Sequence, residues 1–311
     1  MQKNYIDDNA PLLEVRNLSC GYLNRNNYRE VANGINLRLY RGEINGIIGE
    51  IGSGKTTLVR AIEGKIFRSS GDIFFRGESI FIKKNYFKFR KKRVVVKQDS
   101  MNALRPRYSV EFQIRKLFKG GKYNENELKR AFDLLNLDLE ILNKLPVQLS
   151  DGTRHRVLIA MASLVKPEIL IVDEPTAGLD IMAIKGMLKL FRELTQTTSI
   201  IMISSDIIPI FQVCDRVYVM REGQIIEDGK WSELLDKPHH PYVKDLLESM
   251  PSVRNRKKEF VENYNEIRTE CVYSDKCRYI DERCRERIPY RFDGEHGYRC
   301  IKYPEWTDDS A

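Results

Sequence analysis

The sequence has no long hydrophobic run, because nowhere in its 311 residues do 18 apolar residues stand together. A membrane-spanning helix needs such a run, so none is expected. Residues 1–11 are polar and acidic, unlike the basic and then apolar start of a secretory signal, and the chain is therefore expected in the cytosol. The sequence also lacks a long-period repeat, which favours one large domain with a smaller appendage.

Neither sign of charge strongly dominates the chain. It has 52 Lys and Arg residues and 44 Asp and Glu residues, which gives a net charge of +8. Residues 83–97 alone hold eight basic and no acidic side chains, which equals the whole excess. This balance argues against a nucleic-acid-binding protein. The basic segment is interpreted either as a solvated face, such as a hairpin, or as a contact with an anionic partner or membrane surface.

Hydrophobic patterns predict an α/β fold. Residues 12–18, 35–39, 71–75 and 94–96 are typical of strands, and residues 109–164 have helical periodicity with a break near 120–126. Short β-branched runs at 169–172, 200–203 and 217–220 alternate with helices, which indicates a parallel sheet.

A glycine-rich loop joins the apolar run 44–48 to an expected helix over 56–66. Its glycines let backbone N–H groups approach phosphate oxygens, and the helix N-terminus adds partial positive charge. Lys55 is expected to reach the β- and γ-phosphates, and the Thr56 hydroxyl to bind Mg²⁺. The predicted triphosphate-binding residues of this segment are Gly49, Glu50, Gly52, Ser53, Gly54, Lys55, Thr56 and Thr57.

The buried run 169–172 ends in Asp173 and Glu174. Strand ends of a parallel sheet converge on the ligand crevice, so these carboxylates should lie near the glycine loop. Asp173 is expected to hold the Mg²⁺ shell. Glu174 is expected to orient or deprotonate the water that attacks the γ-phosphate.

The chain resembles the ATP-binding cassette (ABC) subunits of transporters, and specifically the oligopeptide, dipeptide and nickel importer branch. The loop, the paired carboxylates and residues 96–106, 177–180 and 238–243 carry the resemblance, which covers roughly residues 12–300. It implies a P-loop NTPase fold, with the cassette at 12–250, a helical subdomain inserted at about 99–166, and a cysteine-containing extension at 251–311.

The resemblance also implies roles for single residues. Gln98 would contact Mg²⁺ and sense the γ-phosphate, and Asp180 would lie in the loop that communicates across a dimer of cassettes. Tyr22 is the expected aromatic side chain to stack on adenine, with Tyr28 and an ordinary surface tyrosine as alternatives.

Two departures from the family pattern stand out. The signature loop, normally Leu-Ser-Gly-Gly-Gln, has Ser150, Asp151, Gly152 and Thr153 after its leucine. Asp151 would repel a triphosphate bound to the partner unless its side chain points away. Ser205 occupies the usual position of a histidine and cannot replace an imidazole contact to the γ-phosphate. These departures predict that the chain works as one half of an unequal heterodimer and that it hydrolyses ATP only weakly when it is alone.

Four of the six cysteines lie in the tail, at positions 271, 277, 284 and 300. The tail is polar and short of apolar side chains, so a cross-link or metal centre is expected. Spacing alone leaves an iron–sulfur cluster, zinc, disulfides and free thiols open. The resemblance favours a 4Fe-4S cluster held by Cys271, Cys277, Cys284 and Cys300, with Zn²⁺ as the alternative. Cys20 and Cys214 are expected in the core.

The resemblance therefore implies an ATPase that energises a membrane importer of peptides or related oligomers, including oligosaccharides. Its expected partners are a second ABC ATPase, two transmembrane permeases and an external substrate-binding protein, with the chain on the cytoplasmic face of the membrane. Two alternatives are a cassette that binds ATP mainly as a structural or regulatory element and a soluble cassette ATPase without a transporter.

Overall fold

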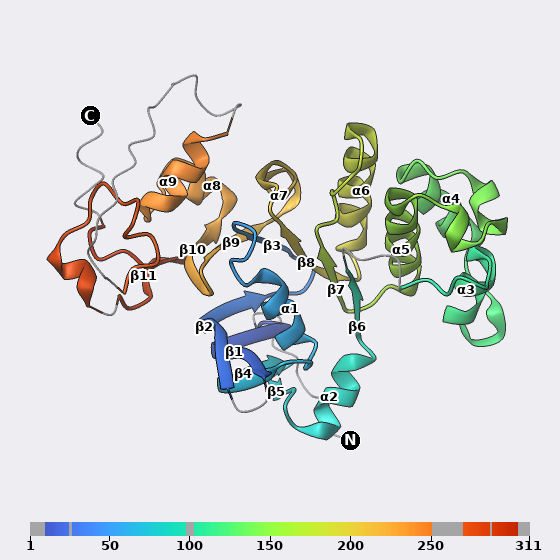
Figure 1. Ribbon diagram of the computed structural model, residues 1–311. Coiled ribbons are helices and arrows are strands. Elements are labelled where there is room, and N and C mark those ends of the chain that lie inside the picture. The colour runs from blue at the N-terminus through green and yellow to red at the C-terminus, as the bar shows by residue number, and fades with distance from the viewer. Residues whose placement is uncertain (1–9, 25–26, 98–102, 251–269, 287, 304–311) are drawn as a thin grey trace.

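The computed structural model describes residues 10–24, 27–97, 103–250, 270–286 and 288–303 (Figure 1). It contains two sheets with strand orders β2-β1-β4-β5 and β11-β12-β10-β9-β3-β8-β7-β6. Among these residues, no helix combines the length and the apolar character needed to cross a membrane.

The smaller sheet is antiparallel and comes from the start of the chain. Its strands are β1 (Leu13–Asn24), β2 (Asn27–Leu39), β4 (Phe67–Phe75) and β5 (Glu78–Ser79). The strands expected at 12–18, 35–39 and 71–75 all lie in it, and all three are longer than expected. Helix α1 (Lys55–Ile62) packs against this sheet. The helix ends four residues earlier than expected, because Gly64 takes a left-handed φ of 67° and β4 begins soon after.

The larger sheet has a parallel part and an antiparallel edge. The parallel strands are β6 (Arg93–Val96), β7 (Ile169–Asp173), β8 (Ser199–Ser204), β3 (Ile44–Ile48) and β9 (Arg216–Arg221). The edge adds β10 (Gln224–Lys230), β12 (His296–Tyr298) and β11 (Arg291–Asp293). The parallel α/β sheet expected from the buried runs is confirmed.

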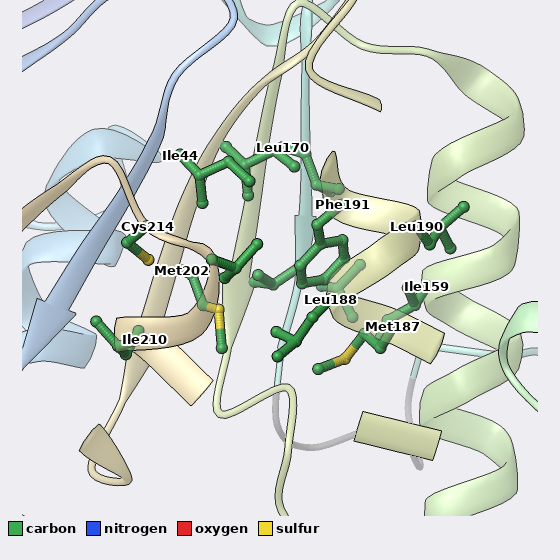
Figure 2. Packing of buried hydrophobic residues seen from close by; sticks show 14 of the residues in the cluster. Ile44, Ile159, Leu170, Met187, Leu188, Leu190, Phe191, Met202, Ile210 and Cys214 are labelled. Atoms are coloured by element: carbon green, nitrogen blue, oxygen red, sulfur yellow. The ribbon is translucent and has the colours of Figure 1, made fainter. Parts of the chain in front are cut away.

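Alternate residues of the central strands enter two different cores, as the period of a strand requires. Ile47 and Ile201 face α1 and the smaller sheet, whereas Ile44 and Met202 face helix α6 (Ile181–Leu194) and helix α7 (Ile207–Val213). Figure 2 shows Phe191 of α6 among these side chains. Cys20 and Cys214 are buried in these cores, as expected.

Three helices, α3 (Val110–Leu117), α4 (Glu125–Leu134) and α5 (Asp151–Val165), lie between the neighbouring strands β6 and β7 in the chain. They stand at one side of the molecule (Figure 1). Helix α4 packs on α6, where a Cβ at Gly186 would lie 1.6 Å from the Leu134 carbonyl oxygen. Glycine is therefore required for this close helix approach.

The basic segment is not a hairpin, contrary to the interpretation offered from the sequence. Residues 83–90 form helix α2 (Lys83–Arg90), and the apolar residues that follow continue into β6 of the large sheet. Half of its cations pair with acids elsewhere: Lys88 with Glu78, Lys92 with Glu168, and Lys97 and Arg93 with the buried Glu63. Much of its charge is therefore compensated within the fold.

Helices α8 (Trp231–Asp236) and α9 (Pro241–Glu248) follow β10. The described part of the extension then returns to the cassette, because β12 pairs with β10 and β11 pairs with β12. The extension thus lies at the opposite edge of the large sheet from β6 (Figure 1).

Candidate ATP-binding site

The glycine loop lies between β3 and α1, the strand-to-helix turn that the sequence predicts. Gly54 has φ of 102°, a conformation that side-chain-bearing residues rarely adopt. A Cβ at Gly49 would lie 2.1 Å from the Met220 carbonyl oxygen. The loop is therefore shaped by glycine at both positions.

Lys55 lies inside the curve of this loop. Its Nζ donates to the carbonyl oxygens of Gly49 at 2.7 Å and Glu50 at 2.9 Å. Burial lowers the pKa of Lys55, and the nearby charges of Glu174, Asp173 and Glu50 oppose that shift. The hydroxyl of Ser53 is buried and has no partner among the described residues. The Lys55 ammonium and the Ser53 hydroxyl thus line a turn whose backbone N–H groups are suited to bind phosphate oxygens.

The Glu50 side chain points elsewhere. Its carboxylate receives Arg221 Nη1 at 2.9 Å, so the sequence-predicted contribution of Glu50 to the loop comes from its backbone. Thr57, by contrast, is buried in the first turn of α1, and Thr56 beside it is exposed. The exposed hydroxyl is the one predicted to bind Mg²⁺.

Asp173 and Glu174 occupy the end of β7. Asp173 is buried, and burial together with the charge of Glu174 raises its pKa. Glu174 has φ of 49°, which turns its carboxylate toward β8. There it accepts the backbone N–H of Ser205 at 2.8 Å and the hydroxyl of Ser204 at 3.2 Å. Two donors therefore fix the orientation of Glu174.

Ser204 contacts Glu174 in this site and is a residue that sequence reasoning missed. Ser205 was singled out for its side chain, yet its backbone N–H makes the contact with Glu174 and the neighbouring hydroxyl makes the second. The register that places Asp173 opposite Ile203 explains both contacts, because it brings the ends of β7 and β8 together.

Of the two candidate adenine-stacking residues, only Tyr22 contacts the helix that follows the loop. Its hydroxyl lies 3.3 Å from Thr57 Oγ1 and receives Arg60 Nη1 at 2.9 Å. Tyr28 instead donates to Ser69 at 3.1 Å and packs edge-on against Phe67. Tyr22 is 38% exposed as a residue, and the Arg60 guanidinium lies 5.7 Å from the centre of its ring, which leaves the other face of the ring for a planar ligand.

The signature residues begin α5. Ser150 caps this helix by accepting the N–H of Thr153 at 3.2 Å, and Asp151 forms an ion pair with Arg154 one turn later. The expected repulsion of a triphosphate by Asp151 is therefore partly compensated on the same helix. An added Cβ at Gly152 would lie 3.4 Å from the carbonyl oxygen of Gly178, so this helix start borders the loop that contains Asp180. Asp180 itself caps α6 through the Ala183 N–H at 2.9 Å.

Gln98 lies outside the described residues. Helix α5 belongs to the insertion between β6 and β7, whereas Lys55 begins α1 after β3 and Glu174 directly follows β7. The phosphate-binding residues and the signature residues of this chain therefore begin two different helices, α1 and α5.

The four tail cysteines are largely buried, and no disulfide joins any of the six cysteines. Burial raises the pKa of Cys277 to about 12 and of Cys300 to about 11, and the neighbouring thiols of the set add to both shifts. No three of these four sulfurs, all in described residues, lie within 4.8 Å of one another. A tetrahedral zinc site would place its sulfurs about 3.8 Å apart.

A phosphate-binding turn, paired carboxylates at the neighbouring strand end and a helical insertion between β6 and β7 define an ATPase of the ATP-binding cassette class. The ABC transporter family profile matches residues 32–177, and the profile of the oligopeptide/dipeptide transporter C-terminal region matches residues 226–286.

Known proteins that are similar to the chain belong to the same class. The chain is 37% identical over 262 residues to the oligopeptide transport ATP-binding protein OppD of Bacillus subtilis, covering 78% of this chain and 73% of that protein. It is 31% identical to the dipeptide transport ATP-binding protein DppD of Haemophilus influenzae, covering 89% and 91%. The solved structure of cbiO1 from Clostridium perfringens, part of the ABC transporter complex cbiONQ, matches with a TM-score of 0.62, 30% identity and coverage of 78% and 97%.

The chain belongs to the ATP-binding subunits of the oligopeptide and dipeptide ABC transporter family. It is accordingly a transport-coupled ATPase.

Proposed function

We propose that this chain energises the import of peptides by hydrolysing ATP at sites that it shares with a second, unlike ABC subunit. The orientation of Glu174 by Ser204 and Ser205 carries this proposal, because a carboxylate held beside Lys55 is suited to position an attacking water. Oligopeptides and dipeptides are the substrates that the names of these two relatives give.

The residues present fit MgATP. Lys55 and the loop N–H groups would hold the β- and γ-phosphates, Thr56 and Asp173 would hold Mg²⁺ with Gln98, and Tyr22 would stack on adenine. Mg²⁺ would neutralise phosphate charge when bound. Glu174 would accept the proton of the water, and Lys55 would stabilise charge on the terminal phosphate.

The signature residues Ser150, Asp151, Gly152 and Thr153 would face ATP bound to the second subunit. They begin α5 in the insertion between β6 and β7, whereas Lys55 begins α1 after β3, and this placement on different elements supports sites completed by a second subunit. Two permeases and an external substrate-binding protein would complete the importer, with this chain bound peripherally at the cytoplasmic face of the membrane.

The test uses the full importer in vesicles. Lys55→Ala should abolish ATP binding by this subunit, whereas Glu174→Gln should retain binding and reduce ATP-driven peptide uptake about 100-fold or more. Uptake that Glu174→Gln leaves unchanged would contradict hydrolysis by this subunit. Thr57→Ser serves as the matched loop control, because it keeps the hydroxyl that faces Tyr22.

A second candidate is a cassette that binds ATP but leaves most hydrolysis to its partner. Ser205 favours it, because a serine at this position contacts Glu174 only through its backbone and supplies no imidazole. In that case Glu174→Gln would lower uptake little, while Lys55→Ala would still prevent ATP-dependent assembly.

We also propose that Cys271, Cys277, Cys284 and Cys300 hold a 4Fe-4S cluster, with Zn²⁺ as the alternative. Mutual proximity of the thiols, their burial and their spacing wider than a zinc site support a larger centre. Anaerobically purified protein should be brown and contain about four iron and four sulfide per chain, the cluster's own composition. A colourless preparation with one zinc bound by sulfur would reject the cluster.

A further inference from the structure

Three potential metal ligands meet where β10 joins the C-terminal hairpin. They are Glu227 on β10, His239 before α9 and His296 on β12, and all three are at most 5% exposed. His296 Nε2 lies 2.7 Å from Glu227 Oε1 and 3.0 Å from His239 Nδ1, and that Nδ1 lies 3.9 Å from the same Glu227 oxygen. The three atoms therefore form a closed triangle inside the protein.

A hydrogen atom on His296 Nε2 can serve both of its contacts only as a shared, three-centre hydrogen bond, which is weaker than two separate bonds. An imidazole nitrogen has one position in the ring plane, which is either an N–H or a lone pair. If Nε2 donates to Glu227, the same proton must also serve the His239 Nδ1 lone pair; if it accepts from His239, it has no proton for Glu227 and no second lone pair for a protonated carboxyl. A bound cation would accept lone pairs from all three atoms at once.

The size of the triangle suits such an ion. Zinc binds histidine nitrogen and carboxylate oxygen at about 2.0–2.2 Å in a tetrahedron, so bound atoms lie about 3.3 Å apart. The three observed separations, 2.7, 3.0 and 3.9 Å, fall on both sides of that value.

Neighbouring groups orient the ligands. His239 Nε2 lies 3.3 Å from Asp293 Oδ2, and donation to this carboxylate leaves Nδ1 as the lone pair that faces the triangle. A metal-bound histidine usually donates its other N–H in this way. The Glu227 carboxylate is held by the N–H groups of His239 at 2.7 Å and His240 at 2.8 Å.

The buried charge of Glu227 also favours a bound cation. Glu227 is completely buried, and the adjacent Asp228 is buried as well. Asp228 is balanced by Arg216 at 2.5 Å, so a divalent ion at the triangle would balance Glu227. Two imidazoles favour a transition metal over Mg²⁺ or Ca²⁺, which prefer oxygen ligands.

We propose that Glu227, His239 and His296 bind one divalent transition-metal ion of the zinc class, which fastens the β11–β12 hairpin to the cassette. This site is separate from the four cysteines. His240 is not a ligand, because its Nδ1 accepts the N–H of Tyr242 at 3.1 Å and caps α9.

The test measures metal in the purified full-length chain. After exposure to Zn²⁺ and removal of excess ion, His296→Gln and His239→Gln should each contain one zinc per chain less than the unmodified protein. His240→Asn is the matched control, because asparagine can still cap α9, and it should lose none. Equal zinc in the unmodified protein and both Gln variants would overturn the proposal.

Cobalt separates this site from the cysteines. The absorption spectrum of the Co²⁺-loaded unmodified protein is compared with the spectra of the Gln variants. The bands that the variants lose should be visible d–d bands without sulfur-to-cobalt charge transfer, since the proposed ligands are nitrogen and oxygen. If the lost absorption includes a sulfur band, the ion belongs to the cysteines and the proposal is wrong. Asp293→Asn changes a side chain that is 57% exposed, so the fold should tolerate it, and it should weaken Zn²⁺ binding about 10–100-fold. Unchanged affinity in Asp293→Asn would count against the assigned geometry.

Discussion

The two edges of the large sheet are built on different principles. Toward β6, the strands β7, β8 and β3 are buried along their whole length and mostly apolar. Toward β11, the added hairpin is short, β11 is exposed throughout, and the residues of β12 are His, Gly and Tyr. Apolar burial therefore holds one edge, and specific polar contacts hold the other.

The polar contacts at the extension edge connect residues far apart in the chain. Arg299 donates to the carbonyl oxygens of Ile225, Ile288 and Gly34 at 3.1–3.2 Å. Tyr290 donates to Asp228, which also pairs with Arg216. Each contact is worth about 1 kcal/mol net, but a buried partner left alone costs about 1–3 kcal/mol. The extension should therefore be sensitive to single polar substitutions.

Arg221 links this edge to the nucleotide site. It is buried, donates to the Val272 carbonyl oxygen at 2.8 Å and to Glu50 at 2.9 Å, and lies over the rings of Tyr242 and Tyr273. A change in the cysteine-bearing segment thus has a direct physical route to the glycine loop.

The difference between the apolar and the polar edge of the large sheet also explains which features could be predicted from the sequence. The run 169–172 and the carboxylates after it were predictable, because a buried parallel strand has a composition of its own. The Ser204 contact with Glu174 was not, because it depends on the register between two strands. Arg221, Glu227 and His296 were not singled out either, because their partners are brought together only by the antiparallel edge.

The largest effect is expected at the apolar edge, from Gly186→Ala. The new Cβ would lie 1.6 Å from the Leu134 carbonyl oxygen, so α4 must move away from α6. Overpacking of this kind costs about 1–3 kcal/mol, which exceeds the helix preference of alanine of about 1 kcal/mol. Denaturant unfolding should show a net loss of up to about 2 kcal/mol. Gly152→Ala, with 3.4 Å of room, is the control and should not be destabilised.

A smaller loss is expected at the polar edge, from Arg221→Lys. Lysine keeps the charge but cannot donate to Glu50 and Val272 together in the same planar arrangement. We expect a loss of about 1.5 kcal/mol in unfolding free energy and faster amide exchange in both the loop and residues 270–276. Arg192→Lys, at an exposed ion pair with Asp215, should change stability by less than about 0.5 kcal/mol. Exchange that rises in one segment only would break the proposed link.

The next prediction concerns the strand ends between the two edges. Ser205→His should raise ATP turnover of the assembled pair up to about tenfold, if an imidazole restores one charged hydrogen bond to the γ-phosphate. Ser205→Ala should leave turnover unchanged, because the backbone N–H that holds Glu174 remains. A drop in Ser205→Ala would show that the hydroxyl has a role that the structure does not assign to it.

The smallest structural effect is expected from Asp151→Asn on the surface of α5. The Asp151 side chain is 79% exposed, so its pair with Arg154 should contribute less than about 1 kcal/mol to stability. Its removal leaves Arg154 positive beside the start of the helix, where a triphosphate on the partner subunit would be attracted. Sedimentation with MgATP should therefore show tighter association of the two subunits at low salt, with the gain shrinking as ionic strength rises. Weaker association would mean that the Asp151–Arg154 pair itself shapes the surface that meets the partner, and that its charge is not what limits closure.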